Sequence, residues 1–539
     1  MAFTELEEHK LELIANRLGE TESEHSRINW QDWLPRIWGG LAFVILMLSV
    51  LLVPYNDLRP TRVLGFAMLT TMSVAGYGWL LLRLRPDLLV KGRRQLMFGT
   101  SVLLTSAILQ SLGSVDTSEL PYDMGTGVAP AALFGMMLLA GISYAVVFDQ
   151  KFAAAGLMFL SLALVMVLHD KSFFRPVDMG IALVGVLAAI LQTRNLSSRY
   201  KLALVGLAGG ITSALVILGL WLVGVGKYWD VPAQTAWMHI LNWSIGAIVV
   251  GAAVGMFSTF QLPIFERVFG ITTELRLIEL KNSEHPLIDL MQQRAPGTWQ
   301  HTQNVANFTS AACEAVGANA LLGEVGVKFH DLGKMVRPEY FTENEPESKL
   351  LHDQLSAQMS AMIILSHVAD GVLMARKYKL PEVIEDFITG HHGTSIIKYF
   401  YFKAKAVAVE GETVDPNQFR YPGPKPQIKE SAIAAIADQV EATARSRFAG
   451  ASFVPDDIRN MVHQSITDKM LDGQFDECDI TLAEWKLVED SLVASLSGMY
   501  HHRVKYPDDP DKDKRQAALE AREKYRRELA KRKERILTQ

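Results

Sequence analysis

The stretch His330-Asp331-Leu332-Gly333-Lys334 ends a predicted helix in the polar half of this chain. Gly333 lets the backbone turn sharply away from that helix. An aspartate placed there can use both carboxylate oxygens, one for each of two metal ions. Imidazole and carboxylate groups together suit iron, manganese or zinc. A lone His-Asp pair is a weak signal, so the interpretation depends on further ligands elsewhere in the sequence.

Histidines and an aspartate on successive predicted helices complete the set. His391-His392 is flanked by Gly390 and Gly393, which favour a helix end where both imidazoles converge on one ion. Inside a regular helix, adjacent side chains would point about 100° apart. A single histidine is more often structural than a ligand, and only the ordered set overturns that interpretation. The seven candidate ligands, enough for two ions, are His301, His330, Asp331, His367, His391, His392 and Asp438.

Five other histidines in the polar half lack this context. His352-Asp353 repeats the dipeptide but has no following glycine and lysine, so we interpret it as structural. The same interpretation applies to His285, His463, His501 and His502.

Helical periodicity continues through the polar half from Glu266 onward. We predict a connecting helix at 273–280 and expect Thr298 to be the N-cap of the helix that holds His301. The proline-rich segment 404–428 is expected to be a loop or a short hairpin. Strand signals are weak, so the predicted fold is all-α. The expected helices are 301–316, 320–330, 354–375, 381–390, 430–447, 455–470 and 482–500.

Apolar sequence is concentrated before about residue 262. The chain is 49% hydrophobic with a mean hydropathy of +0.14, which is high for a soluble enzyme. A membrane-spanning helix needs roughly 20 apolar residues, and buried core helices explain so many apolar segments in series less well. Residues 148–151 are either a tight turn between two spans or a sign that the span boundary is misplaced. The number of spans could therefore also be seven or nine. The eight expected spans are 36–54, 63–83, 96–113, 129–148, 151–168, 177–193, 202–225 and 237–260.

Lysine and arginine in the short loops predict the orientation of these spans. The loops 83–95 and 194–201 are rich in basic residues, whereas the loop 114–128 has none and carries three acidic residues. The basic loops are therefore expected on the cytoplasmic side, and with eight spans both termini lie there too. The first 35 residues are charged and do not resemble a cleavable signal peptide.

Composition limits the partners and divides the 539 residues into parts. The net charge is −5, so no global basic field indicates a nucleic acid polymer as a partner. Two cysteines form neither a zinc motif nor a disulfide framework, which favours a reducing setting for the polar half. A charge-dense helix at 515–535 is expected to be solvated, since it lacks a clean apolar seam for a coiled coil or a partner. The expected parts are a cytoplasmic segment 1–35, a transmembrane domain 36–262, a metal-binding domain 263–505 and a charged helical tail 506–539.

The combined motifs resemble the HD superfamily of metal phosphohydrolases. More closely, the chain is similar to PgpH-type seven-transmembrane HD proteins, which hydrolyse cyclic di-AMP. The resemblance covers the last seven expected spans and the HD domain. It rests on the segments Ala295-Pro296-Gly297-Thr298 with His301, His330 to Lys334, His367-Val368 with Asp370-Gly371, His391-His392-Gly393, Arg420-Tyr421-Pro422-Gly423-Pro424-Lys425-Pro426, and Asp438-Gln439-Val440-Glu441-Ala442.

The resemblance implies two divalent ions, iron or manganese, in a phosphodiesterase that converts cyclic di-AMP to pApA. His301, His330, Asp331 and Asp438 would hold the first ion, and Asp331 would bridge to a second ion held by His367, His391 and His392. It places Asp331 and Lys334 in the catalytic machinery, with Lys334 and Arg445 offsetting phosphate charge, although Lys334 could instead pair structurally with a neighbouring carboxylate. The implied location is the cytoplasmic membrane of a bacterium, in contact with the lipid bilayer. Such proteins usually carry a large extracytoplasmic domain after the first span, and here that connection is only 55–62.

Three other functions are weighed against this one. The first is an HD phosphohydrolase with a different nucleotide substrate, since the residues alone do not exclude cyclic di-GMP. The second is a membrane receptor whose HD domain only binds nucleotide, which the full ligand set disfavours. The third is a transporter, which the spans do not support, since they lack buried charges and broken helices in pairs. No residue argues for the homo-oligomer that remains possible.

Overall fold

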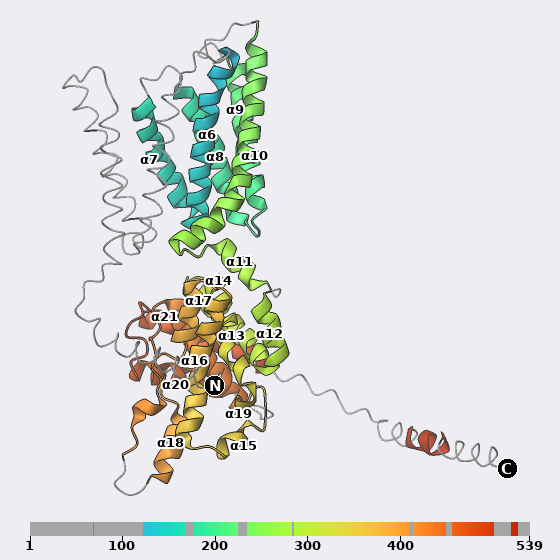
Figure 1. The fold of residues 1–539 in the computed structure, drawn as a ribbon, viewed down its shortest axis with the longest axis vertical. Helices are drawn as coiled ribbons and strands as arrows, with labels where there is room; N and C mark the ends of the chain where they lie inside the picture. Colours follow the sequence, from blue (N-terminus) through green and yellow to red (C-terminus); the bar gives the residue numbers. More distant parts are fainter. Residues whose placement is uncertain are drawn as a thin grey trace, which may run out of the picture.

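The computed structural model describes residues 68, 83, 122–168, 176–224, 234–282, 285–408, 413–448, 455–500 and 519–526. Figure 1 shows a bundle of long helices joined through one short helix to a cluster of shorter helices. Apart from Met68 and Arg83, the first three expected spans lie outside the described residues, as does the connection 55–62. The all-α prediction is confirmed: the pairing between Ile396 and Arg420 is the one β-bridge in the described part of the chain.

Five long helices correspond to the last five expected spans. Gln150 begins the fifth span directly after a turn in which the backbone N–H of Phe152 donates to Asp149 Oδ1 at 2.7 Å, so residues 148–151 form the tight turn. The last span runs nine residues past its expected end, across the expected domain boundary at 262–263. The helices are α6 (Tyr122–Val147), α7 (Gln150–Leu168), α8 (Pro176–Gln192), α9 (Lys201–Leu222) and α10 (Ala236–Phe269).

Four helices among the described residues are long and apolar enough to cross a membrane, namely α6, α9, α10 and α16 (Ala357–Lys377). The helix α16 is better explained as a core helix of the polar domain. It buries His367 and Asp370, and charged or ionisable groups are costly at membrane depth. It also packs on the turn that carries Asp331. Length and apolarity alone therefore select one helix that is not a span.

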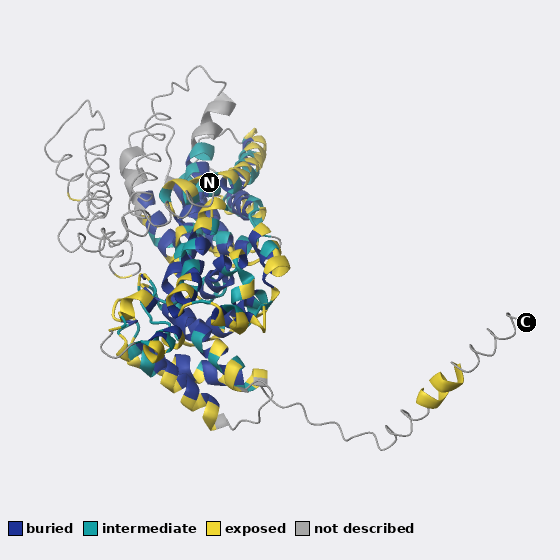
Figure 2. Ribbon diagram, turned by 60° about the horizontal axis from the view of Figure 1, so that its bottom comes forward, coloured by how far each residue is buried: buried dark blue, intermediate teal, exposed yellow. Residues whose placement is uncertain are grey.

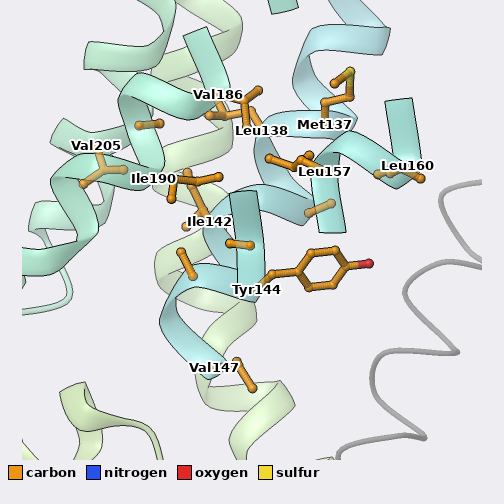
Figure 3. Packing of buried hydrophobic residues seen from close by; sticks show 14 of the residues in the cluster. Met137, Leu138, Ile142, Tyr144, Val147, Leu157, Leu160, Val186, Ile190 and Val205 are labelled. Atoms are coloured by element: carbon orange, nitrogen blue, oxygen red, sulfur yellow. The ribbon is translucent and has the colours of Figure 1, made fainter. Parts of the chain in front are cut away.

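Apolar side chains fill the space between α6, α7 and α8. Figure 3 shows Leu138 and Ile142 of α6 beside Leu157 of α7 and Ile190 of α8. All four side chains are at most 1% exposed. Figure 2 shows that buried residues fill both the long-helix bundle and the cluster below it, whereas the short helix in the tail, residues 519–526, is exposed.

The helices α9 and α10 touch through their backbones. A Cβ atom on Gly206 would lie 2.3 Å from the carbonyl oxygen of Gly251, and one on Gly251 would lie 2.5 Å from that of Gly206. Gly210 and Gly255, each four residues further on, make similar contacts. Small residues at this spacing let spanning helices approach closely, where dispersion rather than the hydrophobic effect holds them together.

A short connection joins the bundle to the polar domain. The helix α10 ends at Gly270, whose φ of 59° reverses the chain. Thr273 then caps α11 (Glu274–Lys281), so the predicted connecting helix is confirmed. Arg199, from the loop before α9, bonds to Glu266 of α10 at 2.8 Å and to Glu279 of α11. One guanidinium therefore binds both sides of the junction.

We expect Arg199→Met to destabilise the junction. The change leaves the Glu266 and Glu279 carboxylates, 11% and 36% exposed, without their main cation. Lost hydrogen bonds to charged groups cost about 2 kcal/mol, so the thermal unfolding midpoint of the full chain in detergent should fall by several degrees. Arg276→Met is the control, because Arg276 makes only one weaker contact with Glu279, at 3.3 Å. Equal unfolding midpoints for the two variants would show that Arg199 does not stabilise the junction between α10 and α11.

The polar domain buries its core around α19, whose alanines allow neighbouring helices to approach closely. Ala432, Ala434 and Ala437 are at most 2% exposed and pack with side chains of α13, α20 and α21. The helices are α12 (Pro286–Arg294), α13 (Pro296–Ala315), α14 (Ala320–Lys328), α15 (Ser348–Asp353), α16, α17 (Glu382–Gly390), α18 (Lys398–Val407), α19 (Lys429–Phe448), α20 (Pro455–Leu471) and α21 (Leu482–Tyr500). Short 3-10 turns are η4 (Leu332–Val336), η5 (Pro338–Tyr340) and η6 (Pro416–Phe419).

Each of the seven expected helices of the polar domain is present, with two corrections. The helices α12, α15 and α18 were not expected, and α18 reaches into the segment 404–428 predicted as loop or hairpin. The N-cap prediction for Thr298 is wrong, because Pro296 already occupies the first turn and the helix begins there. The backbone N–H of Thr298 donates instead to Asn344 Oδ1 at 2.9 Å.

Candidate metal centre

Three helices and two turns bring all seven predicted ligands together. One cluster joins His301 of α13, His330 and Asp331 from the turn after α14, and Asp438 of α19. The other joins His367 of α16 with the two histidines that follow α17. Within each cluster the candidate ligand atoms all lie within 4.8 Å of one another, and only His392 is more than slightly exposed. The helix end predicted at Gly390 is confirmed, so both imidazoles of His391-His392 can face one point.

Asp331 faces both clusters. Its Oδ2 atom lies 3.2 Å from His330 Nε2 and 3.7 Å from His301 Nε2. Its Oδ1 atom lies 3.5 Å from His367 Nε2 and 3.7 Å from His391 Nε2. The two oxygens of this carboxylate therefore lie beside histidines of different clusters.

Backbone carbonyls orient three of the imidazoles. The Nδ1 atoms of His330 and His367 each lie 2.6 Å from a carbonyl oxygen three residues earlier, and His391 Nδ1 lies 2.9 Å from the carbonyl of Phe387. A carbonyl only accepts, so each Nδ1 donates its proton, and Nε2 is the ring atom that faces the cluster and can bind a metal ion once it is deprotonated. This is the usual arrangement behind histidine ligands of metals.

The centre has buried atoms that no protein group satisfies. Asp331 Oδ1 and His330 Nε2 have no hydrogen-bonding partner in the described part of the chain. Burial, followed by the charge of His330, lowers the pKa of His391 to about 3, so that imidazole is neutral. Burial alone would lower the pKa of His301 too, but its bonds to Asp438 and Glu441 raise it to about 9. Neutral imidazoles in the second cluster, and carboxylates that attract positive charge in the first, fit divalent cations.

The two predicted phosphate-binding cations are held by carboxylates. Lys334 Nζ lies 2.7 Å from Asp331 Oδ2 and 2.9 Å from Glu343 Oε1, so the structural pairing weighed for this residue is the one found. Arg445 bonds at 2.5 Å to Glu441, whose other oxygen lies 2.5 Å from His301 Nδ1. Lys334 thus contacts the candidate ligand Asp331 directly, and Arg445 contacts the candidate ligand His301 through Glu441. A direct contact of either with phosphate stays a prediction.

Residues without an assigned role surround the clusters. Glu441 follows Asp438 by three positions, so the spacing of one helix face could have indicated it as the partner of His301. The Tyr421 ring stacks on His392 with centroids 4.1 Å apart. Its segment is fixed by Arg420, which donates to the carbonyl oxygen of Thr394 at 2.8 Å. The segment 420–426 therefore forms a wall of the centre.

Two families match the sequence. Residues 60–273 match the family described as a 7TM receptor with intracellular HD hydrolase, and residues 298–443 match the HD domain. The first match covers the bundle of long helices as far as α11, and the second begins at Thr298 and ends just beyond Glu441. All seven candidate ligands lie within the second match.

Two curated proteins and one solved HD domain are similar to this chain. The cyclic-di-AMP phosphodiesterase PgpH of Bacillus subtilis is 40% identical over 60% of this chain and 44% of its own length. The protein of the same name from Listeria monocytogenes is 38% identical over 71% and 50%. The chain thus spans about half the length of these curated relatives. The solved HD domain of L. monocytogenes PgpH in complex with cyclic-di-AMP is 44% identical, covers 41% of this chain and 100% of that one, and has a TM-score of 0.38.

Proposed function

Because the chain belongs to the family of 7TM receptors with an intracellular HD hydrolase, we propose that it is a metal-dependent phosphodiesterase acting on cyclic di-AMP. The chain is a multi-pass membrane protein. Hydrolysis adds water across one P–O3′ bond, so the linear product pApA carries a 5′-phosphate and a free 3′-hydroxyl. The adenine preference is taken from the PgpH relatives.

The position of Asp331 is the observation that carries the phosphodiesterase proposal. One carboxylate with an oxygen in each of two histidine clusters supports a pair of ions that share this ligand. We assign His301, His330 and Asp438 to the first ion. We assign His367, His391 and His392 to the second. Iron and manganese suit this set of nitrogen and oxygen donors.

A pair of divalent ions supplies an activated water at neutral pH and neutralises phosphate charge during in-line displacement. The chain's own residues do the positioning. Lys334 keeps Asp331 ionised, because burial alone would raise the pKa of that carboxyl, whereas His330 and then Lys334 hold it well below its usual range. Glu441 fixes the His301 ring, and Tyr421 covers His392.

The same proposal places the protein in the cytoplasmic membrane of a bacterium, with the HD domain on the cytoplasmic side. The basic residues of the loop 194–201 support that side, since Arg199 from this loop contacts the connection to the HD domain. The expected partners are the cyclic dinucleotide and the lipid bilayer, with a homo-oligomer as a further possibility.

Product analysis with the full chain tests this function. The protein, purified in detergent, is incubated with Mn²⁺ or Fe²⁺ and with cyclic di-AMP, cyclic di-GMP or AMP in parallel. Formation of pApA from cyclic di-AMP is the expected result. Preferential turnover of another nucleotide would keep the phosphohydrolase and discard the adenine assignment. Tight binding of nucleotide with metal bound but no product would favour a receptor.

We expect Glu441→Gln to weaken the first metal site without removing a ligand. Glutamine can still accept from His301 Nδ1, but it carries no charge to make that imidazole a stronger donor. Loss of such a partner typically weakens metal affinity about 10- to 100-fold. Titration of Mn²⁺ against activity should therefore shift to higher concentrations, with kcat recovered at saturation. Glu430→Gln, in the same helix but bonded only to the backbone N–H of Asn319, is the control. An unchanged Mn²⁺ requirement in Glu441→Gln would rule out this positioning role.

A further inference from the structure

One buried cation beside the candidate metal centre has no partner among the residues that the structure describes. Lys469, in the last turn of α20, is only 8% exposed. Its ammonium makes neither a hydrogen bond nor an ion pair within the described ranges of the chain, whereas Lys334, Arg420 and Arg445 all bind oxygen atoms of the protein. Lysine is almost never buried unless it is paired.

The position of Lys469 relates it to both parts of the centre. The helix α20 packs on α19, which carries Asp438, and the charge of Lys469 acts on Asp438 and on His392. The turn after α20 also contacts the turn after His392. There Gln474 Oε1 accepts from the backbone N–H of Thr394 at 2.8 Å, while the N–H of Gln474 donates to the carbonyl of Lys469 at 3.0 Å. These contacts fix the end of α20 at the rim of the second histidine cluster.

Burial of this ammonium is costly in the protein alone. Removal from water lowers the pKa of Lys469 to about 8, and the carboxylates of Asp438 and Asp472 only partly oppose that effect. An anion brought in by a ligand would supply the missing partner and recover part of the cost. A charge-assisted hydrogen bond from an ammonium to a phosphate is among the strong ones.

We infer that Lys469 binds a non-bridging phosphate oxygen of the substrate, a role for which the sequence offered Lys334 and Arg445. The inference rests on the proposed function. It makes the substrate a phosphodiester that is recognised here by its charge and not by its base. The same contact is therefore made with any phosphodiester that reaches the metal centre.

The test compares three variants of the full chain in detergent with Mn²⁺: Lys469→Met, Lys469→Arg, and the control Lys398→Met, whose ammonium is exposed and paired with Asp468. Substrates are cyclic di-AMP and bis(p-nitrophenyl) phosphate, which has no base. We expect Lys469→Met to raise KM for both roughly 10- to 100-fold, with kcat and bound Mn²⁺ nearly unchanged. Lys469→Arg should recover much of the affinity, and the control should match wild type.

Thermal unfolding separates binding from a structural role. Replacing a buried unpaired lysine by methionine keeps the apolar stem and removes a desolvated charge, so the unfolding midpoint should stay equal or rise. A lower midpoint, loss of Mn²⁺, or an unchanged KM in Lys469→Met would each overturn the inference. If wild type hydrolyses neither substrate, the proposed function fails separately. Calorimetric titration with inorganic phosphate then decides on Lys469, since equal affinity in wild type and Lys469→Met contradicts the inference and weaker affinity in the variant supports it.

Discussion

Asp331→Ala is expected to lower kcat for cyclic di-AMP by at least about a thousandfold, because an ion pair of this kind supplies several kcal/mol of stabilisation in the transition state. The substitution removes a carboxylate whose two oxygens face different histidine clusters. Each cluster keeps its other ligands from the protein, but the Asp331 carboxylate that would hold two dications close together is lost. We expect the variant to retain fewer than two ions per chain.

Metal analysis and steady-state kinetics on the same preparation check this result. Lys334 keeps Glu343 as a partner in the variant, so the change does not leave an unpaired buried ammonium behind. Asp353→Ala is the control, since Asp353 is half exposed and pairs only with Lys403 at 3.0 Å. Two bound ions with full activity in Asp331→Ala would contradict the bridging role and with it the two-ion centre.

The second large effect is expected from Gly333→Ala. A Cβ atom at this position would lie 1.8 Å from the carbonyl oxygen of His367 and 2.7 Å from the backbone nitrogen of Gly371. Both contacts are with the backbone of α16, so no side chain can move aside. The turn η4 must separate from α16, which pulls Asp331 away from His367.

We expect Gly333→Ala to destabilise the protein by about 3 kcal/mol or more, at the upper end of overpacking effects. The thermal unfolding midpoint and the Mn²⁺ content should fall together, because one displacement causes both. Gly498→Ala is the matched control: Gly498 lies exposed in α21 with no atom near the added methyl group, and alanine favours the helix. A thermal unfolding midpoint equal to that of wild type in Gly333→Ala would show that η4 and α16 do not pack this closely.

The sequence predicted the structure well where the signal lies in a short segment, either as a motif of metal-binding residues or as a helical period. Seven ligands were found because histidine and aspartate occur in short motifs at helix ends, and the structure brings all seven together. The helix α18 was missed because its buried face is narrow: Phe400 and Ala404 face the core, whereas Tyr399 and Phe402 are exposed. Aromatic residues on both sides hide the helical period.

The partners of the charged residues could not be predicted in the same way. Lys334 is paired with Glu343, nine positions away across two short turns, and no spacing rule connects the two. Lys469 in the last turn of a helix is typical of a solvated residue that favours the helix C-terminus. Only the packing of α20 on α19 buries it. Sequence patterns therefore identified the candidate metal ligands but not the cation that we propose binds substrate.

The junction at Gly270 has a mechanical consequence. The helix α10 has 34 residues and a length of roughly 50 Å, and Arg199 holds its end against α11. A helix of that length acts as a lever arm, so a tilt of about 5° at its far end moves the near end by roughly 4 Å. Spanning helices tilt when the bilayer becomes thinner. A change in membrane thickness would then move the whole HD domain as one body, without altering the contacts inside its candidate metal centre.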